Sequence, residues 1–60
     1  MDFVEDGKFY IVYNESCKLG CIHRDRVDGE VFIDFVPRVS NLSANELEEV
    51  VNFMKGLKDG

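Results

Sequence analysis

An Asp28-Gly29 dipeptide stands between two short strand-like runs, CIHRDRV at 21–27 and EVFIDFV at 30–36. Glycine accepts the positive φ angle that tight hairpin turns require, so this arrangement is a strong short-range signal for a β-hairpin. Pro37 follows the second run and ends it, because proline has no N–H to donate to a strand ladder. We therefore expect an antiparallel hairpin made of strands 21–27 and 30–36.

One further strand and one helix are predicted on either side of this hairpin. The run 8–13 is aromatic and β-branched almost throughout, which is typical of a strand. Ser43 and Glu46 have the spacing of a capping box and predict a helix over 44–58. Its apolar residues recur at helical spacing and are expected to face the core. They are Leu47, Val50, Val51, Met54 and Leu57, with Phe53 at the edge of the stripe.

These elements predict a single small α+β domain over residues 1–60. It would be a three-stranded antiparallel meander followed by one C-terminal helix that packs on one sheet face, in the order β-β-β-α. A chain of this length buries only about 60% of the surface that its unfolded form exposes. Stability is therefore expected to depend on regular packing, a crosslink, a metal or a partner subunit.

The hairpin loop determines which strand residues share a face. A two-residue loop at Asp28-Gly29, or a four-residue loop around it, places Ile22 opposite Phe35 and His23 opposite Asp34. The face that carries Ile22 and Phe35 is the more apolar of the two, and we expect the helix to cover it. The face that carries His23 and Asp34 is expected to stay open to solvent.

The open face is predicted to mix apolar and acidic side chains, which is typical of an interaction surface. Strand 8–13 is apolar on both sides, so it adds either Tyr10 and Val12 or the alternating set that begins with Phe9. Segment 2–6 is an alternative cover for this patch. The residues predicted to contact a partner are Tyr10, Val12, His23, Asp25, Phe32 and Asp34.

Both cysteines and the only histidine are close in sequence, as Cys17, Cys21 and His23. A structural zinc site needs four ligands, and no second cluster in the chain completes this spacing. A disulfide would require residues 18–20 to form a tight loop that places the two thiols opposite each other. We predict reduced cysteines, no metal and no other cofactor. A metal-stapled or redox-responsive domain that uses these three residues is the alternative.

No catalytic constellation emerges from the sequence. His23 opposite Asp34 would be a hydrogen-bonded pair, but it lacks a credible nucleophile and a water-excluding cleft. The glycines are isolated and form no phosphate-binding loop. We therefore expect a protein that is not an enzyme.

The charge balance limits the classes of partner. Twelve acidic and seven basic residues give a net charge of −5, which disfavours direct binding to nucleic acid. The chain opens without a basic region and has no long apolar run, so we expect neither a secretory signal nor a membrane-spanning helix. A cytoplasmic location is predicted.

The function that these features favour is a small protein-binding module that acts without chemistry. In length, compactness and acidity the chain resembles the short reading frames of bacteriophages and other mobile elements, although no family motif carries the likeness. That resemblance implies an inhibitor of a host or defence protein. A homodimer through the open sheet face, or through the edge of strand 8–13, would also enlarge the thin core.

A second hypothesis is an acidic nucleic-acid mimic that blocks a DNA-binding protein. Mimicry of this kind requires carboxylates in rows on one face. The row would begin with Asp25, Glu30 and Asp34.

Overall fold

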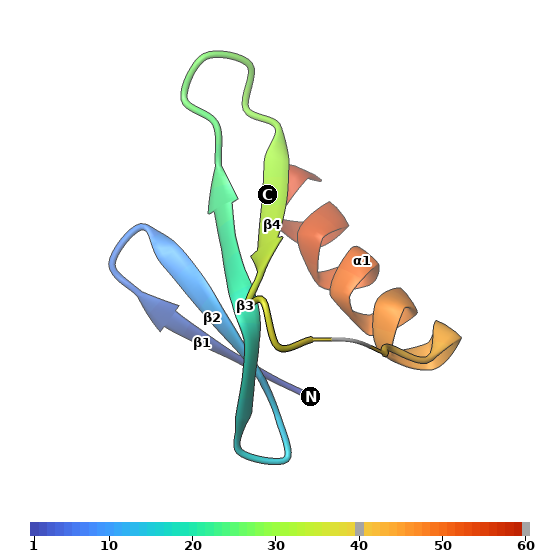
Figure 1. The fold of residues 1–60 in the computed structure, drawn as a ribbon. Coiled ribbons are helices and arrows are strands. Elements are labelled where there is room, and N and C mark those ends of the chain that lie inside the picture. Colours follow the sequence, from blue (N-terminus) through green and yellow to red (C-terminus); the bar gives the residue numbers. More distant parts are fainter. Residues whose placement is uncertain (40, 60) are drawn as a thin grey trace.

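The computed structural model of this protein describes residues 1–39 and 41–59 and shows an α+β fold (Figure 1). Four antiparallel strands form one sheet in the order β1-β2-β3-β4, and one C-terminal helix packs beside β4 and against one sheet face. The predicted fold class is confirmed, but the sheet has a strand more than expected. No helix within the described ranges is long and apolar enough to cross a membrane. The elements are β1 (Asp2–Asp6), β2 (Phe9–Asn14), β3 (Cys17–Arg24), β4 (Val31–Phe35) and α1 (Ala44–Asp59).

The unexpected strand is β1, which pairs with β2 through Phe3 opposite Val12 and Val4 opposite Ile11. Gly7, with a φ of 65°, begins the two-residue turn between them, as a type II′ hairpin requires. Segment 2–6 therefore extends the sheet sideways and does not fold over the open face. The predicted association through the edge of strand 8–13 is also wrong, because β2 has a neighbour on each side.

The β2–β3 hairpin closes through Glu15 and Ser16, whose φ angles are 51° and 67°. Positive φ at both central positions is the mark of a type I′ turn, which matches the twist of the strands but disfavours residues other than glycine and asparagine. Because this turn comes so early, β3 begins at Cys17 rather than at residue 21. A bulge follows, where Lys18 lies opposite Tyr13 and Gly20 opposite Val12, so that β3 contains an extra residue between them.

The β3–β4 pairing is displaced by two residues from the prediction, with Ile22 opposite Ile33 and His23 opposite Phe32. The Asp25 N–H donates to the Glu30 carbonyl at 2.7 Å, and the loop therefore spans residues 26–29. Carboxylates stabilise it, since Asp25 accepts from the Val27 N–H and Asp28 accepts from the Glu30 N–H. A shift of two residues leaves every side chain on its predicted face.

At Gly20, β3 and β4 lie too close together for a side chain on β3. A Cβ atom at this position would lie 2.4 Å from the Asp34 carbonyl oxygen and 3.1 Å from the Phe35 Cα. Both contacts are to backbone, which cannot rotate away as a side chain can. The bulge and the β3–β4 pairing therefore depend on glycine here.

The core lies between the sheet and α1. Its buried centre is Val12, Ile22, Val31 and Val50. Phe53 of the helix stacks on Phe3 with ring centroids 4.0 Å apart, and Tyr10 meets the same ring edge-on at 5.1 Å. To place Phe53 there, the helix turns Leu47 and Val51 partly outward, so they are 44% and 45% exposed. The prediction that the whole stripe is core is wrong for these two residues.

The helix is tied to the sheet at both ends. The Ser43 N–H donates to Glu46 Oε1 at 2.9 Å and the Glu46 N–H donates to Ser43 Oγ at 3.1 Å, which confirms the capping box. Asn14 of β2 also donates to the Glu46 carboxylate. At the other end Arg24 of β3 donates to the Leu57 carbonyl, one of the acceptors that a helix C-terminus leaves free.

Candidate binding surface

The sheet face opposite α1, here called the open face, is defined by strand alternation and register. One row across the strands runs Val4, Ile11, Cys21 and Asp34, each opposite the next. A second row brings Phe9, His23 and Phe32 together. Tyr13 completes the face beside Lys18.

The second row is a line of aromatic rings. The His23 imidazole lies between the two phenyl rings, with centroid separations of 6.5 Å to Phe9 and 5.8 Å to Phe32. Phe9 is 48% exposed and Phe32 is 43% exposed. Val4 of the first row is also an exposed apolar residue. Aromatic side chains held in a line and left in contact with water are typical of a surface that a partner covers.

His23 is held in the middle of the line by Asp34. Its Nδ1 atom lies 3.4 Å from Asp34 Oδ2, and the Asp34 side chain is 77% exposed. The two residues were predicted to be directly opposite. Because of the register displacement, Asp34 lies opposite Cys21 and reaches His23 diagonally. The contact places a carboxylate at the border of the aromatic line.

Tyr10 and Val12 are not on this face, and their predicted placement is corrected. Val12 is completely buried, and Tyr10 packs on Phe53 while its hydroxyl donates to Glu5 Oε2 at 3.3 Å. Phe9, Ile11 and Tyr13 lie on the open face instead. Alternation alone gave no choice between the sets, because β2 is apolar on both sides; the aromatic–aromatic packing around Phe53 decides it.

Asp25 is also displaced from its predicted role, because its carboxylate is occupied in the loop by the Val27 N–H at 2.7 Å. Glu30 contacts the helix, where Lys58 Nζ lies 3.2 Å from its Oε1 atom. Of the three predicted acids only Asp34 is on the open face. The row of carboxylates Asp25, Glu30 and Asp34 is therefore not formed.

The two cysteines are free thiols on the same strand. Four residues of extended chain separate their Cα atoms by roughly 13 Å, beyond the reach of a disulfide. The bulge also turns Cys17 to the helix side, with its neighbour Asn14, while Cys21 stays on the open face with Ile11. Residues 18–20 form no tight loop. Among the described residues no group of three His, Cys, Asp or Glu side chains is placed to hold a metal ion.

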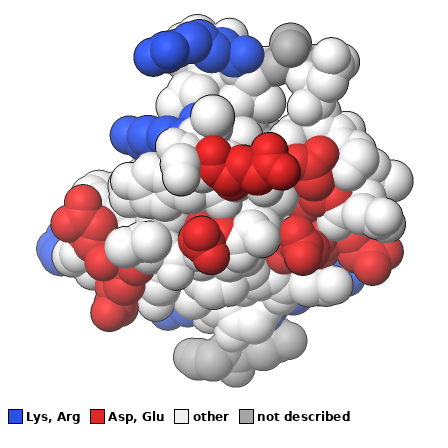
Figure 2. All heavy atoms as spheres, turned by 90° about the horizontal axis from the view of Figure 1, so that it is seen from below, with Lys and Arg blue, Asp and Glu red and all other residues white. Residues whose placement is uncertain are grey.

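Acidic side chains dominate one end of the molecule. Figure 2, a view from below, shows Asp and Glu in several groups across the middle of that surface, with Lys and Arg mostly nearer its margin. The acidic groups in this view lie at the end that carries the β2–β3 turn in Figure 1, and the net charge of −5 in general favours a partner whose surface is basic.

Comparisons with protein-family models, curated proteins and solved structures find no match to this chain. Function is therefore inferred from the chemistry of the surface. The open face is the part of that surface where apolar, aromatic and acidic groups meet.

Proposed function

We propose that this protein is a small, non-enzymatic binding module whose open face docks on another protein. The observation that carries the proposal is the exposed aromatic line of Phe9, His23 and Phe32. A rigid sheet presents these rings without the entropy cost of ordering a loop, and aromatic residues carry much of the energy at protein interfaces.

The partner would offer an apolar hollow for the phenyl rings and basic groups near Asp34. A second copy of this chain is a poor candidate, because association would bring two net charges of −5 together. Occupying a partner's surface without chemistry is the action of an inhibitor. This role agrees with the predicted likeness to small phage or mobile-element inhibitors of host or defence proteins.

The alternatives have less support from the fold. Asp25 and Glu30 are engaged within the fold, which leaves a nucleic-acid mimic without its row of free carboxylates. The thiols of Cys17 and Cys21 are on opposite faces, so a metal or redox role would have to use them separately. The His23–Asp34 pair lies on the open sheet face, where the Asp34 side chain is 77% exposed.

The test is affinity capture from a plausible host lysate with three tagged baits: wild type, Phe32→Asp and Val27→Asp. Val27 is a matched control, because it is 95% exposed in the β3–β4 loop and outside the open face. We expect one stoichiometric partner with wild type and Val27→Asp, and its loss with Phe32→Asp. Circular dichroism of the purified baits verifies that all three are folded. Identical captures by all three baits, or none by any, would refute docking through this face.

A further inference from the structure

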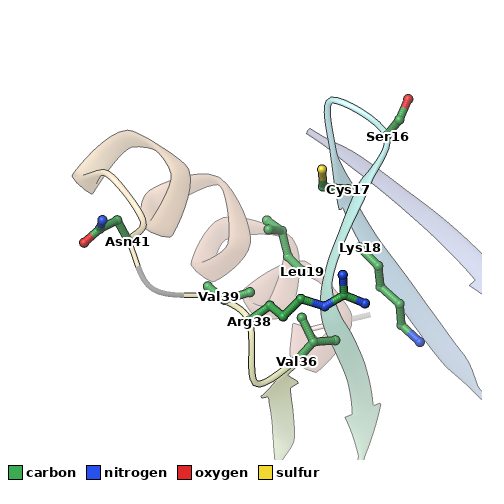
Figure 3. A pocket seen from close by; sticks show the side chains of 8 residues that line it. All are labelled: Ser16, Cys17, Lys18, Leu19, Val36, Arg38, Val39 and Asn41. Atoms are coloured by element: carbon green, nitrogen blue, oxygen red, sulfur yellow. The ribbon is translucent and has the colours of Figure 1, made fainter.

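A groove of about 560 Å³ opens at the end of the sheet, away from the aromatic line. Residues 16–19 of the β2–β3 hairpin form one wall, and Val36, Arg38, Val39 and Asn41 of the segment between β4 and α1 form the other. Figure 3 shows Ser16 and Cys17 near the hairpin turn, with Asn41 on the connection that faces them. The groove differs from the open face in two ways: it exposes an unpaired strand edge, and its charged side chains are basic.

The first respect is an exposed strand edge. β4 ends at Phe35, which lies opposite Gly20, so residues 17–19 of β3 continue beyond their β4 partner. The Val36 N–H donates to the Leu19 carbonyl at 2.9 Å, and a turn at Pro37 then carries the chain away from β3. Around Lys18 the outer edge of β3 therefore faces the groove rather than a strand. Such an edge is a template for an added strand.

The second respect is charge. Among the described residues, Lys18 and Arg38 are the charged ones that line the groove, and no Asp or Glu of this part of the chain lines it. Neither forms an ion pair with any residue that the structure describes. Both cations border the groove, and they make the local potential more positive than the net charge of −5 would suggest. The groove therefore offers cations to an acidic ligand.

Between the edge and the cations the groove is apolar. Leu19, Val36 and Val39 are half-buried side chains that line it, and Figure 3 shows them between β3 and the connection to α1. A ligand that uses all three features has a backbone to pair with β3, an aliphatic side chain and a carboxylate. An extended acidic peptide segment has this combination.

We propose that this groove binds an extended peptide segment with alternating aliphatic and acidic residues, by strand addition to the outer edge of β3 at Lys18. The aliphatic side chain packs on Leu19, Val36 and Val39, and the carboxylate lies near Lys18 and Arg38. The protein then carries two binding sites of opposite character: an open face for a basic partner and a groove for an acidic segment.

The first experiment is an NMR titration of the ¹⁵N-labelled protein with an eight-residue peptide of alternating valine and glutamate, capped at both ends. Shifts are expected at residues 16–19 and on the segment 36–39, with binding that weakens as salt rises. A peptide with N-methyl groups on alternate amides keeps its charge but cannot pair as a strand, so its affinity is expected to fall at least tenfold. Equal binding of both peptides, shifts confined to the open face, or no shifts at all would overturn the proposal.

The second experiment compares two double variants with the same change of charge. The double variant Lys18→Ala, Arg38→Ala is expected to lower the affinity for the valine–glutamate peptide by about fivefold or more, as for the loss of two exposed ion pairs. Lys8→Ala with Lys55→Ala removes two exposed cations outside the groove and is the control. An equal loss in both variants would show attraction to charge in general, and the groove would not be the site.

Discussion

The two faces of this sheet are built from the same strands, yet they use their aromatic residues differently. On the covered face Phe3, Tyr10 and Phe53 pack into one cluster with centroids 4.0 and 5.1 Å apart. On the open face Phe9 and Phe32 flank His23 at longer separations and remain almost half exposed. The difference indicates that the first cluster contributes more to the stability of the fold, while the second stays exposed, as the proposed binding role requires.

The largest expected difference in stability comes from removing one aromatic ring from each face in turn. Phe53→Ala removes the centre of the covered cluster and is expected to cost about 3 kcal/mol of unfolding free energy. Phe32→Ala removes a half-exposed ring and is expected to change stability by less than about 0.5 kcal/mol. Urea denaturation followed by circular dichroism measures both values. Equal losses would mean that the open face is structural too.

A smaller loss is expected where β3 meets the edge strand β4. Gly20→Ala places a Cβ atom 2.4 Å from the Asp34 carbonyl oxygen, so β3 and β4 must separate. We expect about 2 kcal/mol of destabilisation from this overpacking.

Gly56→Ala is the matched control for this prediction, because its Cβ would meet nothing within 4 Å in α1. It is expected to stabilise the protein by about 0.5–1 kcal/mol through helix propensity. Thermal denaturation of the two variants gives the sign of each effect. A neutral Gly20→Ala would mean that the strands are not held in this register.

The β2–β3 turn predicts a gain of stability. Glu15 and Ser16 hold φ angles of 51° and 67°, which asparagine and glycine adopt at less cost. The double variant Glu15→Asn, Ser16→Gly is expected to gain about 1 kcal/mol. Partner capture through the open face should be unchanged, because neither residue lies on it. A destabilised double variant would contradict the type I′ turn.

The smallest effect is a pH dependence at the helix N-terminus. The Ser43 N–H, and then the Ser43 hydroxyl, hold the pKa of the Glu46 carboxyl below its usual value of 4.5. A lowered pKa in the folded state means that ionised Glu46 stabilises the fold above pH 4.5 and that this contribution is lost as pH falls through the folded pKa.

The Glu46→Gln variant tests this contribution. Glutamine keeps a capping side chain but does not titrate, so its melting temperature should decline less than that of wild type as pH falls below 4.5. Thermal melts at a series of pH values compare the two proteins. Parallel curves would show that the cap contributes no pH dependence.

Much of the fold was predictable because its signals are local. The capping box needs only Ser43 and Glu46 at the right spacing. The faces of β3 and β4 followed from alternation, and they survived an error in register because the displacement was even. His23, Phe32 and Asp34 were placed on the open face for the same reason.

The features that escaped prediction depend on contacts between distant residues. β1 is short and rich in acids, and it is a strand because β2 offers it a free edge. The choice between Phe9 and Tyr10 on β2 depended on the ring of Phe53, far away in the chain. The two central positions of the β2–β3 turn, Glu15 and Ser16, held no glycine or asparagine to reveal it, and the bulge beside Gly20 followed from that turn.

The most direct test of the open face is the affinity of the captured partner for wild type, Phe32→Asp and Val27→Asp, measured by titration calorimetry. An interface anchor is worth about 2 kcal/mol or more, which predicts a loss of roughly thirtyfold or greater for Phe32→Asp. Val27→Asp should bind as tightly as wild type. Equal affinity of the three proteins would contradict the account, because the aromatic line would then lie outside the interface.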